Sequence, residues 1–139
     1  MKKVLLDINV LLDILQDRKP HVVTSSQVWA AIEHGRIKGF VPAHGVTTIH
    51  YLVRKARGAA AARRTIGIIV QVLDVAGVDS NVIKNSLLLG WPHFEDAVTA
   101  AAAEAAECDA IITRDPKGFP DSHVRVLTPE TAAALLVKI

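Results

Sequence analysis

The sequence predicts one α/β domain, residues 1–139, built on a central parallel sheet of four to five short strands with helices on both faces. Two observations lead to this fold class. Short apolar runs alternate with longer segments of helical periodicity along the whole chain. These runs are also continuous rather than alternating with polar residues, which is typical of parallel strands buried on both faces. A chain of 139 residues is long enough to form such a core as a single domain.

The predicted strands are the short apolar runs, at residues 4–6, 39–42, 73–75, 110–112 and 125–127. Seven helices are predicted around them, over residues 10–15, 20–35, 45–55, 59–73, 81–89, 94–107 and from 129 onward. Thr128 is a suitable N-cap for the last helix, and Pro129 suits its first position. The apolar segment 132–137 of that helix fits either the core or an interface.

The composition excludes several classes of protein. Half of the residues are apolar, so the chain is globular rather than disordered. Its net charge of +2 is too small to indicate a nucleic-acid binder by itself, and the scarcity of aromatic residues argues against a surface that stacks bases. Cys108 is the only cysteine, which excludes a thiolate zinc cluster, and the histidines show no metal-ligand spacing. Without a signal-peptide pattern or a membrane-spanning run, we expect a cytoplasmic protein with no membrane contact.

Three aspartates stand at positions that indicate a cation site. Asp7 and Asp115 follow predicted strands, and the carboxyl ends of parallel strands lie at one edge of a sheet. Asp96 lies in the first turn of the alanine-rich helix. Carboxylates gathered at one edge repel one another unless a cation or protons intervene, and oxygen ligands without cysteine favour Mg²⁺ or Mn²⁺ over zinc. Such a cation can activate a water for attack on a phosphate.

Each of these acids also has a purely structural interpretation. Asp7 or Asn9 can cap the following helix by accepting backbone N–H groups, Asp96 is stabilised by the helix dipole, and Asp115 begins an ordinary turn. The remaining aspartates lack the same-edge placement, and we interpret them as solvated or capping residues. They are Asp13, Asp17, Asp74, Asp79, Asp109 and Asp121.

A basic cluster forms the second candidate site. No acid occurs between Glu33 and Asp74, so the positive charges within this stretch are not neutralised locally. The cluster consists of Arg54, Lys55, Arg57, Arg63 and Arg64. Positive side chains of this kind either contact a phosphate backbone or form a solvated helix face, and the sequence leaves both interpretations open.

Three segments, VLLDINVLLDIL, FEDAVTAAAAEAAECDAIITRDPKGF and VRVLTPE, resemble the PIN-domain family in order and spacing over nearly the whole chain, and in particular its branch of VapC-like toxin ribonucleases. The resemblance implies a parallel-sheet nuclease whose acidic edge binds Mg²⁺ or Mn²⁺ and which cuts single-stranded or structured RNA. It also implies an antitoxin protein as partner and a homodimer. By motif, Asp7, Asp96 and Asp115 match the catalytic and metal-binding acids, assisted by Asn9 and Thr113.

The chain departs from the family pattern at one acid. The family usually places a second acid in the helix after the second strand, and the segment VPAHGVTTIHYLVRK has Thr48 at that place. His93 stands where many relatives carry a further aspartate. The resemblance then implies a site of three carboxylates, with Thr48 and Glu95 as auxiliary residues, and weaker cation binding.

The leading functional prediction is a metal-dependent endoribonuclease, the toxin of a type II toxin–antitoxin pair, whose RNA backbone contacts come from Arg54, Lys55 and Arg57. A PIN-like module that binds RNA or a protein but has weakened catalysis is the alternative, because the second acid is missing. A phosphatase with Asp7 as nucleophile is a third reading. It is the least favoured, because Asn9 occupies the position where such motifs carry an acid.

Overall fold

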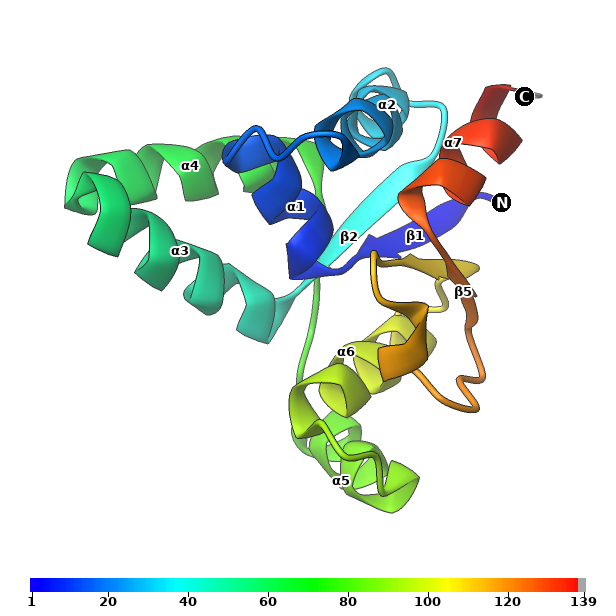
Figure 1. Ribbon diagram of the computed structural model, residues 1–139. Helices are drawn as coiled ribbons and strands as arrows, with labels where there is room; N and C mark the ends of the chain where they lie inside the picture. Colours follow the sequence, from blue (N-terminus) through cyan, green and yellow to red (C-terminus); the bar gives the residue numbers. More distant parts are fainter. Residues whose placement is uncertain (138–139) are drawn as a thin grey trace.

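The computed structural model describes residues 1–137, which form one α/β domain around a five-stranded parallel sheet (Figure 1). The strands are β1 (Lys3–Leu6), β2 (Lys38–Pro42), β3 (Asp74–Ala76), β4 (Ala110–Ile112) and β5 (Arg125–Leu127). Their order across the sheet is β3-β2-β1-β4-β5, and every neighbouring pair is parallel. The predicted fold class is confirmed, and each predicted strand lies within about a residue of its observed place.

Side chains of the central strands alternate between two separate apolar clusters, because successive residues of a strand point to opposite faces. Val4 and Leu6 of β1 belong to one cluster, while Leu5 between them belongs to the other. The three residues Val4, Leu5 and Leu6 have no exposed surface. This burial on both faces explains why the strand sequence is continuously apolar.

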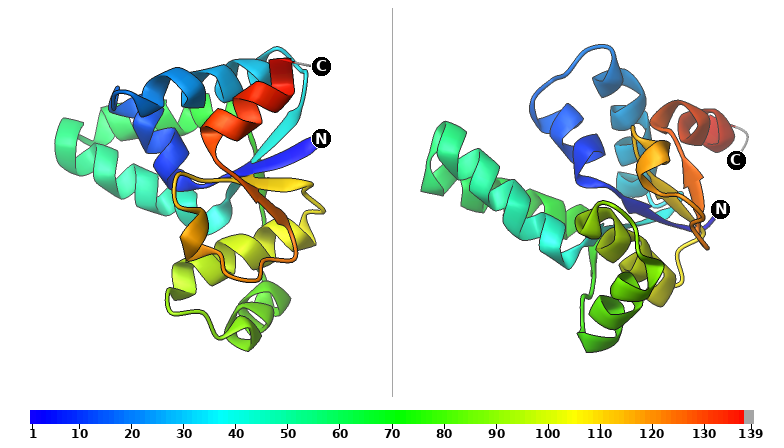
Figure 2. Two further views of the ribbon diagram at one scale, coloured as in Figure 1. Left: turned by 45° about the vertical axis from the view of Figure 1, so that its right-hand side comes forward. Right: turned by 60° about the horizontal axis from the view of Figure 1, so that its bottom comes forward.

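The helices divide between the two faces of the sheet. Among the described residues they are α1 (Ile8–Leu15), α2 (His21–Glu33), α3 (Ala43–Arg57), α4 (Ala59–Val72), α5 (Ser80–Leu89), α6 (Phe94–Ala105) and α7 (Pro129–Val137). Residues of α1, α2, α3, α4 and α7 build one cluster, and those of α5 and α6 build the other. Helices α3 and α4 pack together as a hairpin that extends away from the sheet (Figures 1 and 2).

The packing decides where the C-terminal helix belongs. Ala132 and Leu136 of α7 are buried in the cluster that includes α2, so the C-terminal helix belongs to the core. The predicted domain limit of 139 includes residues 138–139, which lie outside the described part of the chain. Within residues 1–137, every helix is too short or too polar to cross a membrane.

The strand order places a topological switch point at β1. The chain passes from β1 to β2 on one side, whereas β4 pairs with β1 on the other side. In open parallel sheets, ligands bind in the crevice beyond the carboxyl ends of the strands at such a point. The residues that follow β1 and β4 are therefore the first candidates for a functional site.

Candidate active site

Asp7 links the end of β1 to the start of α1. Its Oδ1 accepts a hydrogen bond from the backbone N–H of Ile8 at 2.8 Å, so it caps the helix as the structural interpretation predicts. Its Oδ2 accepts a hydrogen bond from the Thr113 hydroxyl at 2.9 Å, and Thr113 directly follows β4. The capping role and the placement beside the end of β4 are thus both observed in the same carboxylate.

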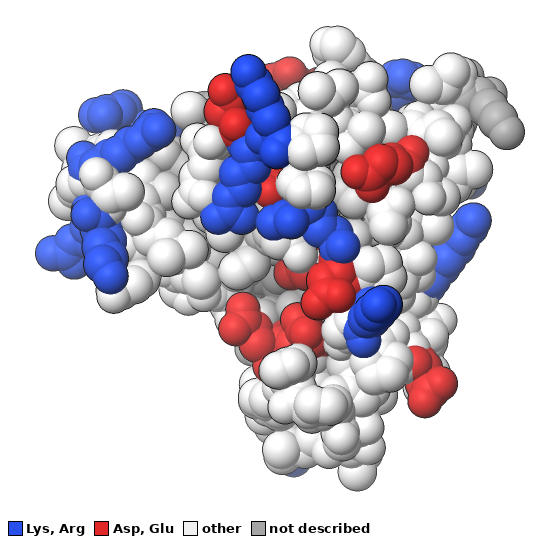
Figure 3. All heavy atoms as spheres, viewed as in Figure 1, with Lys and Arg blue, Asp and Glu red and all other residues white. Residues whose placement is uncertain are grey.

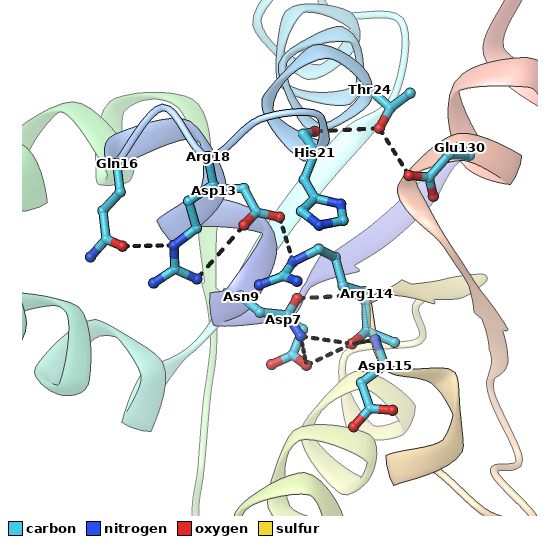
Figure 4. A network of polar contacts seen from close by, with 11 residues as sticks. Asp7, Asn9, Asp13, Gln16, Arg18, His21, Thr24, Arg114, Asp115 and Glu130 are labelled. Carbon is cyan, nitrogen blue, oxygen red and sulfur yellow. Dashed lines mark hydrogen bonds and ion pairs between the residues drawn. The ribbon is translucent and has the colours of Figure 1, made fainter.

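Thr113 is the junction of a network that includes Asp7, Asn9 and Asp115, which are labelled in Figure 4. Its side chain has no exposed surface. While its hydroxyl donates to Asp7, its oxygen lies 3.1 Å from the Asn9 amide nitrogen and 3.1 Å from the backbone nitrogen of Asp115, both of which donate to it. One donated and two accepted bonds use the full capacity of a hydroxyl group. Thr113 therefore holds Asp7, Asn9 and the turn that carries Asp115 in a fixed relation.

Asp96 and Asp115 approach each other across Gly118. A Cβ atom built on this glycine would lie 2.8 Å from Oδ2 of Asp96 and 3.6 Å from Oδ2 of Asp115. Any side chain at residue 118 would therefore push against the Asp96 carboxylate. The absence of a side chain keeps the space between the two acids open.

The pKa values show that the acids share one electrostatic environment. The pKa of Asp96 is raised from 3.8 to about 6, first by burial and then by the negative charges of Asp7, Glu95 and Asp115, against the opposing effect of His93. The pKa of Asp7 is also raised, again mainly by burial, with a contribution from Glu95. The predicted gathering of carboxylates at one edge is therefore what the structure has.

These shifts predict how stability depends on pH in the absence of metal. A raised pKa means that the folded chain holds the proton of Asp96 more tightly than the unfolded chain does. The contribution of Asp96 to the free energy of unfolding is thus present at low pH and is lost as pH rises from about 3.8 to about 6. In EDTA, we expect the melting temperature of Asp96→Asn to increase relative to that of the parent as the pH rises through this window. A difference that stays constant from acid to neutral pH would contradict this.

Thr48 does not take the place of the missing acid in this conformation. Its hydroxyl donates to the backbone oxygen of His44, one turn earlier in α3, at 3.2 Å. The α3 side chain that reaches α6 is instead His44, whose Nε2 lies 3.2 Å from the Thr99 hydroxyl. Burial lowers the pKa of His44, opposed by the charges of Glu95 and Asp7. The sequence offered only a weak signal for it, a histidine in the first turn after a strand.

Asp13 corrects the sequence interpretation, which treated it as solvated or capping. Its side chain has no exposed surface, and its Oδ2 lies 2.7 Å from Nε of Arg114. Arg18 lies farther away, with Nη1 at 3.7 Å from Oδ1. An acid inside the apolar run LLDIL was the available signal, because the helix residues before it are buried and those after it are partly buried. By contrast, Asp79 caps α5 as expected.

The predicted RNA-binding residues lie away from this edge. Arg54, Lys55 and Arg57 are exposed in the last turn of α3, at the tip of the α3–α4 hairpin, where Figure 3 shows a basic group separate from the central acidic one. From His44 to Arg54 the helix rises by about 15 Å, at roughly 1.5 Å per residue. An RNA that reached both places would have to extend along the length of α3.

The donor set at the edge suits a hard divalent cation in its chemistry, because its charged groups are carboxylates, whose oxygen atoms are the ligands that Mg²⁺ prefers. Within residues 1–137, however, no three His, Cys, Asp or Glu side chains are close enough to hold one ion together. Mg²⁺ is commonly bound through one or two carboxylates, with waters and substrate phosphates as the other ligands. The arrangement fits a cation held in that open manner.

Comparison with known proteins places this geometry in context. A family model described as a PIN domain matches residues 3–117. No curated protein matches the chain in sequence. The fold is similar to that of VapBC-1 from nontypeable Haemophilus influenzae, with a TM-score of 0.71, 12% identity, and coverage of 92% of this chain and 98% of that one.

Two further solved structures have the same fold. A toxin–antitoxin complex from Klebsiella pneumoniae gives a TM-score of 0.69 and 19% identity, covering 91% of this chain and 97% of that one. VapC20 from Mycobacterium tuberculosis, a toxin that cleaves the sarcin–ricin loop, gives a TM-score of 0.66 and 14% identity, covering 83% of this chain and 92% of that one.

Proposed function

This chain belongs to the PIN-domain family, and on that premise we propose that it is a metal-dependent endoribonuclease. The observation that carries the proposal is the proximity of Asp7, Asp96 and Asp115 at the edge of the sheet, where burial first and then the charges of the neighbouring acids raise the pKa of Asp96 to about 6. A divalent cation relieves the repulsion between carboxylates that lie close together.

Each side chain of the edge has a role in this proposal. One or two of Asp7, Asp96 and Asp115 would bind Mg²⁺ or Mn²⁺ directly, and the remaining acid would contact the waters of the ion. The cation, when bound, would polarise the phosphodiester and lower the pKa of an attacking water. Thr113 fixes the orientation of Asp7 by its hydrogen bond of 2.9 Å, and Asn9 joins the same network. These hydrogen bonds would keep the Asp7 carboxylate in place when no cation is bound.

The experiment that tests the proposal is cleavage of single-stranded RNA by the purified chain in Mn²⁺, in Mg²⁺ and in EDTA. We expect cutting in either metal and none in EDTA. Cutting that persisted in EDTA would show that the activity does not need a cation. An RNA that stayed intact under all conditions would favour the second candidate below.

A catalytically weakened PIN-like module that binds RNA or protein is that second candidate. It is favoured by one observation, which is that the Thr48 hydroxyl is engaged with its own helix and no carboxylate takes its position in α3. Such a module would bind RNA through Arg54, Lys55 and Arg57, and its binding would weaken steeply with salt without depending on metal.

An antitoxin protein is the partner we propose for this chain. An apolar groove of about 180 Å³ runs between α1, α2 and α4, where Leu15, Trp29 and Ile68 are among the lining residues. Ile68 is 57% exposed, which is unusual for a large apolar side chain on a soluble surface. An apolar helix of an antitoxin would cover this groove, as amphipathic helices do in grooves of this kind.

A homodimer is the proposed assembly, and α5 offers the surface for it. Ile83 and Leu87 share a face of the helix, and Leu88 beside them is 84% exposed. We expect Leu88→Asp to convert a dimer to a monomer in sedimentation experiments without lowering the melting temperature. Ile68→Asp, on the opposite side of the sheet, is the matched control. A parent chain that sediments as a monomer would rule out the dimer.

A further inference from the structure

Arg114 lies in the middle of the candidate active site, and the proposed roles above leave it unused. It stands between Thr113 and Asp115, so its backbone is part of the turn that carries one of the acids. Its backbone N–H donates to the Asn9 side-chain oxygen at 3.3 Å. Figure 4 shows its guanidinium between Asp13 on one side and the Asp7–Asn9 pair on the other.

Asp13 anchors the arginine through a single nitrogen. The 2.7 Å contact between Nε of Arg114 and Oδ2 of Asp13 is an ion pair by distance, although the N–H does not point along a hydrogen-bond direction. Within residues 1–137, the Arg114 side chain has no other ion-pair or hydrogen-bond partner. The two terminal nitrogens of the guanidinium therefore have unused donors, on a side chain that is 29% exposed.

The buried ion pair between Asp13 and Arg114 is not explained by the stability of the fold alone. Asp13 is fully buried, and burying a carboxylate costs several kcal/mol that an ion pair does not reliably return. Both Arg114 and Arg18 face this one carboxylate, so a net positive charge remains beside the acidic edge. A guanidinium held at Nε presents its other N–H groups in a fixed plane, which matches two oxygens of a phosphate.

We propose that Arg114, held in place by Asp13, is the residue that binds an RNA phosphate at this active site. The inference rests on the proposed ribonuclease function and adds to it a substrate contact at the acidic edge itself. The acids alone would repel a phosphate, whereas Arg114 beside them gives the RNA backbone a positive group with two donors in one plane. Arg54, Lys55 and Arg57 would then contact the same strand farther along α3.

The test measures binding rather than cleavage. A fluorescein-labelled single-stranded RNA is titrated with the full chain in EDTA, where the proposed metal-dependent cleavage does not occur, over a series of salt concentrations. We expect Arg114→Gln to weaken binding about tenfold, because it removes a charge-assisted bidentate contact. The slope of the logarithm of the association constant against the logarithm of the salt concentration is negative, and its magnitude should decrease by about 0.7, which corresponds to one phosphate contact on a single strand.

Three variants separate phosphate binding from structure. Arg125→Gln removes the same charge at the first residue of β5, at the opposite end of the strands from the site, and is expected to leave the slope unchanged. Arg114→Lys keeps the charge but loses the planar group, so binding should weaken while the slope is kept. The double variant Asp13→Asn/Arg114→Gln removes the unpaired buried acid and should bind as weakly as Arg114→Gln while remaining folded.

The outcomes distinguish this inference from the proposed function. If the parent binds RNA and Arg114→Gln loses no more affinity than Arg125→Gln, Arg114 only supports the turn and the inference is overturned. If the double variant regains both stability and RNA affinity, the loss in Arg114→Gln was structural and the inference is again overturned. If the parent neither binds nor cuts RNA in any metal, the proposed function fails, and the inference fails with it.

Discussion

Asp96→Asn is expected to abolish RNA cleavage while leaving the fold as stable as the parent or more stable. The carboxylate of Asp96 has the most strongly raised pKa of the acids at the edge, because it is partly buried among three other negative charges. An asparagine of the same shape removes one of those charges. The rate should fall by about 10³-fold, which corresponds to about 4 kcal/mol of transition-state stabilisation from the cation.

The matched control is Asp17→Asn. Asp17 is exposed and follows the far end of α1, and its φ of 48° lies in the left-handed region that asparagine tolerates well. This variant removes one carboxylate from the surface without touching the edge, so cleavage should be unchanged. Calorimetric titration with Mn²⁺ should show binding in the parent and in Asp17→Asn, and none in Asp96→Asn.

The combination of lost activity and kept stability is what identifies Asp96 as a functional residue. Substituting a residue that only supports the fold would reduce both activity and stability. Substituting a solvated residue would reduce neither. If Asp96→Asn melted well below the parent and also lost activity, its role would be structural. If it cleaved RNA at the parental rate, the acidic edge would not be the active site.

The sequence predicted the sheet well because the signal for a buried parallel strand is local. A run such as Val4-Leu5-Leu6 is apolar at every position, since both faces of the strand are covered. The same logic predicted Asp7 and Asp115 at one edge, because residues that follow neighbouring parallel strands lie there, and the observed contact at that edge is between Asp7 and Thr113. Their hydrogen bond of 2.9 Å connects residues 106 positions apart in the chain.

The parts that the sequence did not predict depend on contacts between helices. Helical spacing indicates which face of α3 is apolar, but it does not indicate that His44 reaches Thr99 in α6. Likewise, Asp13 looks like a surface acid when it is considered alone. Its burial follows only once the turn after β4 brings Arg114 over α1. Side-chain partners of this kind depend on how distant elements pack together, and the helical spacing of apolar residues in the sequence does not indicate them.

Arg114→Gln is expected to lower the free energy of unfolding by about 3 kcal/mol, because it leaves the Asp13 carboxylate buried without its nearest partner. Adding Asp13→Asn should restore most of the loss, since the double variant has no buried charge. Urea unfolding of the parent, the two single variants and the double variant gives the coupling energy directly. The control is Asp74→Asn, which breaks the exposed pair with Lys38 and should cost less than about 1 kcal/mol.

A large coupling energy together with a stable double variant would mean that the pair is not needed for the fold. The protein could then replace Asp13 and Arg114 with uncharged residues at little cost, and the reason for keeping two charges beside the acidic edge must lie in what binds there. If the double variant were as unstable as Arg114→Gln, the pair would instead be required to hold the turn that carries Asp115. Additive losses from the two single changes would show that the 2.7 Å contact contributes no coupling at all.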